Sequence, residues 1–154
     1  MKQLFVVASC SAALLSGCAS GNKEAGQNPF LSEYNTPFQV PPFDEIKMEH
    51  YKPAFLQGME EQAKEIEAIV NNEEPATFEN TIVALDQSGQ LLSKVSIVFS
   101  GLNSANTNDE MQALSRELSP LLSKHSDDIN LNHKLFARVK EVYEKRESLG
   151  LDKE

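Results

Sequence analysis

Apolar side chains recur at three- and four-residue steps through most of this chain, a spacing that places them on one face of a helix. The steps run through four segments, 48–72, 78–102, 109–129 and 133–143. Outside a short segment at 29–45, no stretch shows the alternation of a strand, and no repeat of fixed period is present. The expected fold class is therefore mainly α, an antiparallel bundle of long helices arranged as hairpins.

Polar residues mark where these helices are expected to begin. Thr77, Asn108 and Asn132 each stand where a side-chain oxygen can accept an N–H group of the first helical turn. Pro53 falls close enough to the start of the first helix to be tolerated, because an N–H lost there has no helical partner. Pro120 lies inside the third apolar stripe, so we expect a kink or a break at that point.

The second segment, 78–102, is expected to form one helix of roughly 38 Å. Gly89 lies in the middle of its apolar stripe and costs about 1 kcal/mol relative to Ala in a helix. It is either a weak point of that helix or a place where another helix comes close. The second explanation is the more informative one.

Composition excludes several classes of partner and site. The 154 residues carry 14 Lys and Arg against 23 Asp and Glu, which gives a net charge of −9 and a pI near 4.8. Phosphate binding needs clusters of basic residues, so nucleic acid is not an expected partner. No basic run suits an anionic membrane surface either. The only cysteines, Cys10 and Cys18, leave no disulfide framework or cysteine-based zinc site downstream.

The first residues have the features of a targeting signal. A short positive start precedes an apolar run over 4–15, which is too short to cross a bilayer. The run ends in Leu-Ser-Gly-Cys at 15–18, which resembles the lipobox of bacterial lipoproteins. The resemblance implies that residues 1–17 are a lipoprotein signal peptide and that Cys18 carries the lipid anchor. An ordinary signal peptide with an accidental Cys18 is the alternative.

The residues after Cys18 bear on the expected location and on the link to the helices. Ala19 follows the cysteine, and by the lipoprotein sorting rule this implies the outer membrane of the cell envelope, with the periplasmic and the surface face both open. Residues 18–28 are small and polar, as in a flexible tether.

Residues 29–45 combine four prolines with several aromatic side chains. Prolines this dense exclude a helix and favour an extended or polyproline-like chain. Aromatic side chains are costly to leave in water, so we expect this arm to lie across the globular surface of the same chain. Recognition of another protein is the less favoured use.

No residue of this sequence is assigned a catalytic or a metal-binding role. There is no His-Glu-x-x-His pair, no Gly-rich phosphate loop and no Gly-x-Ser-x-Gly turn. His50, near the start of the first helix, is expected to make a structural hydrogen bond. His125 is expected to be buried or to act as a cap, and His133 to lie on the surface.

Seven blocks of sequence, taken together and in this order, resemble the amino-terminal region of the M3 metallopeptidases, the thimet oligopeptidase family. The blocks are Asn-Pro-Phe at 28–30, Pro-Phe-Asp-Glu-Ile-Lys at 42–47, His-Tyr-Lys-Pro-Ala-Phe at 50–55, Pro-Ala-Thr-Phe-Glu-Asn-Thr-Ile at 75–82, Leu-Asp-Gln-Ser-Gly at 85–89, Asn-Ser-Ala-Asn-Thr at 103–107 and Leu-Ser-Pro-Leu-Leu at 118–122. The bacterial peptidyl-dipeptidases are the branch that these blocks match best. The resemblance covers residues 28–154.

The resemblance implies a zinc peptidase several times longer than this chain, which releases dipeptides from the C-termini of short peptides. Its zinc would be held in the full-length parent by residues beyond position 154, and none would be bound here. Residues 46–154 would then form the helical amino-terminal region that contributes to the wall of a substrate channel. The expected partners are the missing C-terminal catalytic part of the same polypeptide, short peptides as substrates of the parent and, through the anchor, a membrane.

A second hypothesis comes from a different class of protein. The chain could be a stand-alone helical envelope lipoprotein that acts as a non-catalytic binding module. The length of the reading frame discriminates between the two: several hundred further residues with a His-Glu-x-x-His motif favour the peptidase, and a stop codon after residue 154 favours the binding module.

Overall fold

The computed structural model describes residues 28–150. Cys18, the signal peptide expected over 1–17 and almost all of the tether expected over 18–28 lie outside the described residues. These expectations therefore stay predictions.

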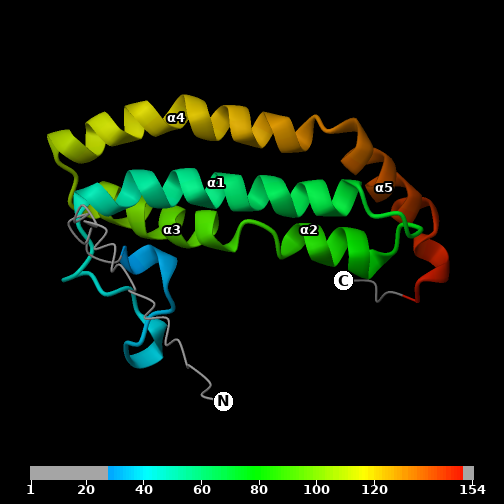
Figure 1. The fold of residues 1–154 in the computed structure, drawn as a ribbon, viewed down its shortest axis with the longest axis horizontal. Coiled ribbons are helices and arrows are strands. Elements are labelled where there is room, and N and C mark those ends of the chain that lie inside the picture. The colour runs from blue at the N-terminus through cyan, green and yellow to red at the C-terminus, as the bar shows by residue number, and fades with distance from the viewer. Residues whose placement is uncertain (1–27, 151–154) are drawn as a thin grey trace, which may run out of the picture.

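The described chain is built from helices that run back and forth along one long axis (Figure 1). Helix α1 (Met48–Val70) runs one way, a broken helical segment ending in α3 (Gln90–Ala105) runs back, and α4 (Asp109–Asn130) returns along α1. Helix α5 (His133–Glu144) turns across the far end. No strand occurs between residues 28 and 150, which confirms the mainly α fold.

The main core lies between α1, α3 and the start of α4, at the end where α1 begins. Four aromatic rings interlock there: Tyr51 contacts Phe30 and Phe99 with ring centroids 5.2 Å apart in each pair, and Phe55 meets Phe99 edge-on at 5.6 Å. Val95 and Leu118 complete this core. Each buried apolar side chain contributes about 1.5–3 kcal/mol, and each aromatic pair about 0.5–1.5 kcal/mol more.

A smaller apolar cluster holds the opposite end together. Ile66 and Ile69 of α1 pack against Leu135 of α5, with Ile129 and Val139 beside them. Leu135 lies on the inner face of α5, in line with the apolar periodicity of 133–143. Phe136 and Tyr143 are 66% and 61% exposed, because each follows a buried residue by one position and is rotated by about 100° around the helix.

The three expected N-caps are confirmed. The side chains of Thr77, Asn108 and Asn132 accept hydrogen bonds from the backbone N–H groups of Asn80, Met111 and both Lys134 and Leu135. His50 makes the expected structural hydrogen bond, because its Nδ1 accepts from the backbone N–H of Lys47 at 3.0 Å. Pro53 lies within α1 and does not interrupt it.

The single helix expected over 78–102 is wrong, because the chain is broken at Gly89. A π-helical segment, η3 (Phe78–Val83), leads into the short α2 (Ala84–Asp86), and a turn precedes α3. Gly89 has φ +73°, a left-handed conformation that ends the helical hydrogen-bond pattern and that favours glycine. A Cβ built there would lie 2.4 Å from Nε2 of Gln62, so the expected close approach of another helix is also present.

Of the kink or break expected at Pro120, the break is wrong. Helix α4 continues through Pro120 as one ribbon that curves gently (Figure 1). Pro120 is exposed, and the carbonyl that loses its helical partner at this point can therefore bind water. A proline on the solvent side bends a helix at lower cost than one in the core.

Residues 29–45 contain no α-helix, but two 3₁₀ turns interrupt the extended chain that was expected. These are η1 (Pro29–Leu31) and η2 (Pro37–Gln39). Phe30 is buried in the main core and Tyr34 packs against it, so the first part of the arm does lie on the surface of its own chain. Phe38 does not, since its side chain is 99% exposed.

Candidate functional site

The three histidines occupy three separate places. His50 caps the start of α1, His125 points from α4 towards α1, and His133 is exposed at the start of α5. Between residues 28 and 150, no group of three or more His, Cys, Asp or Glu side chains is placed to hold a metal ion. What the structure brings together instead are polar side chains that join one helix to the next.

Gln62 of α1 is the centre of the first such junction. Its Nε2 donates to Oγ of Ser88 at 3.3 Å, and Ser88 in turn donates to the carbonyl of Leu85 at 2.8 Å. Its Oε1 lies 2.8 Å from Nε2 of His125. Because an amide oxygen only accepts, the donor in this hydrogen bond is the tautomer of His125 that is protonated on Nε2. One side chain thus links α1, the turn before α3 and α4.

Glu65, one helical turn after Gln62, fixes the same turn from a second direction. Its Oε2 accepts from the backbone N–H of Gly89 at 2.7 Å. Hydrogen bonds to an ionised group are stronger than those between neutral groups. Glu65 therefore holds Gly89 at the point where the helix breaks, and Gln62 occupies the space that a side chain there would need.

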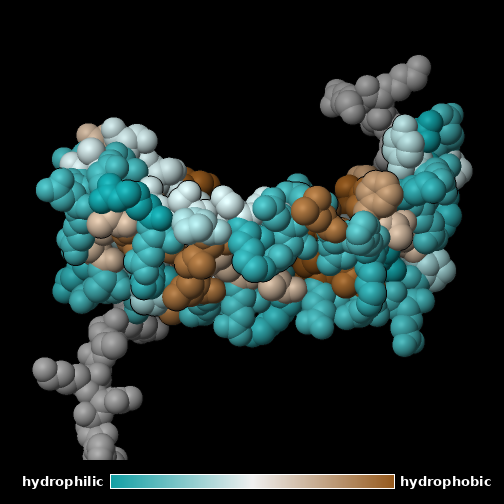
Figure 2. Space-filling view, turned by 90° about the horizontal axis from the view of Figure 1, so that it is seen from above, coloured by the Kyte–Doolittle hydropathy of each residue, from teal (hydrophilic) through white to brown (hydrophobic). Residues whose placement is uncertain are grey.

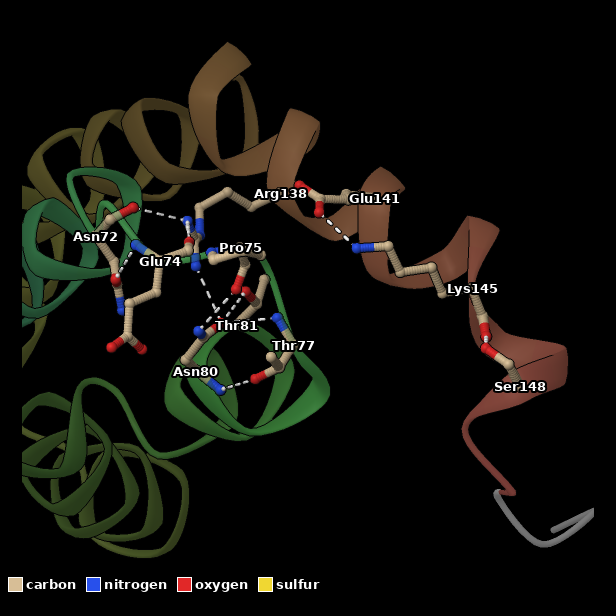
Figure 3. A network of polar contacts seen from close by, with 10 residues as sticks. All are labelled: Asn72, Glu74, Pro75, Thr77, Asn80, Thr81, Arg138, Glu141, Lys145 and Ser148. Carbon is tan, nitrogen blue, oxygen red and sulfur yellow. Dashed lines mark hydrogen bonds and ion pairs between the residues drawn. The ribbon is translucent and has the colours of Figure 1, made fainter.

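Arg138 of α5 is the centre of the second junction, at the far end of the bundle (Figure 3). Its Nη1 donates to the carbonyls of Asn72 and Glu74 at 2.9 and 3.2 Å, and its Nη2 to Oδ1 of Asn80 at 3.0 Å. The loop between α1 and η3 is thereby tied to α5. The Nε of Arg138 is buried and has no hydrogen-bond partner among the described residues.

Asn80 makes this junction possible because it uses both ends of its amide. Oδ1 accepts from the backbone N–H of Thr77 and the hydroxyl of Thr81, both at 2.9 Å, as well as from Arg138. Nδ2 donates to the carbonyl of Pro75 at 3.1 Å. The Thr-Phe-Glu-Asn-Thr block at 77–81 thus supplies both the N-cap of η3 and the acceptor for Arg138.

Lys94 of α3 holds the start of the arm. Its ammonium donates to the carbonyls of Phe30 and Ser32 at 3.1 and 2.7 Å and lies 3.9 Å from the centre of the Tyr34 ring. Burial lowers the pKa of Lys94, and the nearby Glu33 acts in the opposite direction. Burial, and to a lesser extent Tyr51, raises the pKa of the Tyr34 phenol.

Asn28 fastens the same arm to α1. Its Oδ1 accepts from the backbone N–H of Phe30 at 3.1 Å, and its Nδ2 donates to the carbonyl of His50 at 2.8 Å. A groove of about 640 Å³ lies between this arm, α1 and α3. Its lining includes Glu61, which accepts from Gln57, and Lys94, which is already bound to the carbonyls of Phe30 and Ser32.

These junctions hold the helices in place. Each one fixes the relative placement of two or three segments through hydrogen bonds between side chains, or between a side chain and the backbone. Sequence reasoning missed Gln62, Glu65, Lys94 and Arg138, because single polar residues on an amphipathic helix look like parts of a solvated face. The spacing of apolar residues contains no signal that separates a cross-helix hydrogen bond from an exposed side chain.

The face of the bundle on the α4 side is largely hydrophilic, and its hydrophobic surface forms separate patches between polar side chains (Figure 2). Among the helices of residues 28–150, none combines the length and the apolar character needed to span a bilayer.

Comparisons with known proteins identify relatives over most of the chain. Dipeptidyl carboxypeptidase of Escherichia coli (strain K12) is 49% identical over 127 residues, and that of Salmonella typhimurium is 50% identical over 127 residues. Each match covers 82% of this chain and 19% of the relative. Oligopeptidase A of Escherichia coli is 29% identical over 115 residues, which cover 75% of this chain and 16% of that protein.

The matches cover most of this chain but only a small part of each relative. This chain spans about a fifth of the length of the dipeptidyl carboxypeptidases that it matches. No family model matches it. The level of identity over 127 residues nevertheless confirms the resemblance drawn from the seven blocks. Over these 127 residues the chain is therefore homologous to dipeptidyl carboxypeptidases, which are peptidases of the M3 family.

Proposed function

We propose that this chain is part of a peptidase that releases dipeptides from the C-termini of oligopeptides. The observation that carries this proposal is the 49–50% identity to two dipeptidyl carboxypeptidases over 127 residues. Because the chain spans only about a fifth of those proteins, the activity is proposed for a larger assembly of which these helices are one element.

The role we propose for the described region is to form part of the wall of a substrate channel. Three observations support it. The helices form an elongated slab (Figure 1), hydrogen bonds from Gln62, Lys94 and Arg138 fix the slab internally, and residues 28–150 hold no group of three or more His, Cys, Asp or Glu side chains that could bind a metal ion. A wall needs a fixed shape more than it needs reactive groups, because it restricts which peptides reach the chemistry.

Zinc is the metal that the family resemblance implies, and the described residues do not fit it. Two zinc-binding histidines usually share one helical face, with the third ligand close by. Here His50, His125 and His133 lie on α1, α4 and α5, and the first two make hydrogen bonds within the bundle. We therefore assign no metal ligand to residues 28–150 and place the proposed chemistry in another part of the peptidase.

We also propose that Cys18 is lipidated and anchors the protein in the outer membrane. The support is the Leu-Ser-Gly-Cys sequence at 15–18 after a short apolar run. Stable anchoring needs more than one acyl chain, each contributing about 0.8 kcal/mol per buried CH₂. Replacing Cys18 by Ser should move the protein from the membrane fraction to the soluble fraction, or leave it unprocessed. Unchanged membrane fractionation would argue against the anchor.

The proposed activity is tested on the complete product of the reading frame. Purified protein is incubated with an oligopeptide blocked at its N-terminus, and mass spectrometry follows the loss of C-terminal dipeptides with and without a metal chelator. We expect dipeptide release that the chelator abolishes, and none from the 154-residue chain alone. A folded complete product that releases no dipeptide, or a reading frame that stops after residue 154, would favour the stand-alone binding lipoprotein.

A further inference from the structure

The face of α3 that is turned away from α1 carries no charged side chain. It consists of Gln90, Ser93, Ile97, Ser100, Gly101 and Ser104, all of them exposed. Only one residue of α3 is charged, Lys94, and its ammonium is bound by the arm. Charged residues make up 24% of the whole chain, and a helix that faces water usually carries them on its outer face.

The same face carries mostly small side chains. Ile97, which is 68% exposed, is its one large apolar side chain. A Cβ at Gly101 would meet nothing within 4 Å, so no contact within the described chain requires glycine there. Small residues on one helix let another helix approach closely, since interaxial distance is set by the side chains at the contact.

The outer face of α3 continues into a groove between α3 and α4, of about 340 Å³. Its walls are the short polar side chains Ser96, Ser100, Asn103, Ser115, Ser119 and Ser123. Its floor includes Phe99 and Leu118 of the main core. The serines of α4 are spaced four residues apart and therefore form one stripe along the helix. The side chains that line the groove are thus uncharged, and its floor is apolar.

Two of the seven blocks that carry the family resemblance meet in this groove. The block at 103–107 supplies Asn103, and the block at 118–122 supplies Leu118, Ser119 and Leu122. The blocks at 28–30, 50–55, 75–82 and 85–89 have roles in the bundle itself, as caps, core residues and cross-helix junctions. Leu118 and Leu122 likewise pack in the main core, and Oδ1 of Asn103 accepts from Thr107 and Gln112, so these two blocks line the groove and stabilise the bundle at the same time.

We propose that the outer face of α3 and the α3–α4 groove are the docking surface for a helix from the remaining part of the peptidase. The inference rests on the proposed function, because the 127 matched residues make up only 19% of the dipeptidyl carboxypeptidase relatives. A second copy of this chain is a less suitable occupant. Each copy carries a net charge of −9, and like charge opposes self-association.

The test compares the accessibility of this surface in the 154-residue chain and in the complete polypeptide. In a background with Cys10 and Cys18 replaced by Ser, Ser100→Cys and Ser119→Cys serve as two reporters in the groove. Ala113→Cys, a small exposed residue on the other side of α4, is the matched control. The rate of reaction with N-ethylmaleimide is measured at two protein concentrations, and circular dichroism verifies that each variant is folded.

We expect both groove reporters to react about tenfold or more slowly in the complete polypeptide than in the 154-residue chain, with the Ala113→Cys control unchanged. Equal rates in the two proteins would overturn the proposal. Protection that is already present in the 154-residue chain and grows with concentration would also overturn it, in favour of a second copy. Dipeptide release is measured on the same samples. Protection of the reporters without dipeptide release supports the docking surface and contradicts the proposed function. Dipeptide release without protection supports the proposed function and contradicts the docking surface.

Discussion

The bundle is closed by apolar packing at one end and by polar contacts at the other. Where α1 begins, four aromatic rings interlock, and Phe55 and Val95 are almost completely buried. Where α1 ends, the apolar cluster is small, and the guanidinium of Arg138 ties α5 to the loop between α1 and η3. Apolar packing is strong but not directional, whereas a guanidinium with three acceptors fixes one geometry. The packing where α1 begins should therefore contribute most of the stability, and the contacts of Arg138 where α1 ends should fix the position of α5.

Replacing Phe55 by Ala is expected to have the largest effect on stability. Its side chain is buried in the main core, and removing an aromatic ring from a core costs about 3–5 kcal/mol. Urea denaturation followed by circular dichroism measures the loss. Phe136→Ala is the matched control, because Phe136 is mostly exposed and its removal should cost less than about 0.5 kcal/mol. Equal losses for the two variants would contradict the assignment of the main core.

Replacing Arg138 by Met is expected to act on the opposite end alone. The change removes three hydrogen bonds and leaves the carbonyls of Asn72 and Glu74 without their guanidinium donor, at a cost of about 2–3 kcal/mol, while Oδ1 of Asn80 keeps its other two donors. Hydrogen exchange should accelerate in η3 and α5, while amides around Tyr51 stay protected. Lys140→Met, on the exposed side of α5, is the control. Uniform acceleration through the bundle would show that the two ends are not separately held.

Gly89 and Gly101 form a natural pair for a smaller test. Gly89→Ala forces a left-handed residue to carry a Cβ and pushes Gln62 away from Ser88 and His125, so we expect a loss of about 1–2 kcal/mol. Gly101→Ala meets no neighbour within α3 and should stabilise the chain by up to about 1 kcal/mol. Thermal unfolding of the two variants should shift in opposite directions. A gain in stability from Gly89→Ala would contradict the role assigned to the turn.

The sequence predicted the features that depend on local patterns. The helical class, the caps at Thr77, Asn108 and Asn132 and the hydrogen bond of His50 follow from residues a few positions apart, which is why they could be read directly. The continuity of α4 through Pro120 could not, because it depends on that residue facing solvent rather than the core.

The cross-helix junctions could not be predicted either, because the two partners of each hydrogen bond lie far apart in the sequence. Gln62 meets His125 across 63 positions, and Arg138 meets Glu74 across 64, so nothing near either residue in the sequence marks its partner. The blocks that carry the family resemblance did point to one side of each junction, at Ser88–Gly89 and at 77–81. They did not indicate which residue lies opposite.

The smallest expected effect concerns alkaline pH at the aromatic end. Burial raises the pKa of Tyr51 above its ordinary value of 10.0, and its buried hydroxyl has no hydrogen-bond partner among the described residues. A phenol that ionises later in the folded than in the unfolded chain contributes stability below pH 10.0, and this contribution is lost as the pH rises towards the folded-state pKa. Tyr51→Phe should therefore flatten the decline in stability above pH 10 and leave stability at pH 7 unchanged or slightly increased, because an unpaired hydroxyl is removed.

Tyr143→Phe, at an exposed position, serves as the control. Urea midpoints measured from pH 8 to pH 11 decide the matter, and parallel pH profiles for wild type and Tyr51→Phe would show that the buried phenol does not drive the alkaline transition.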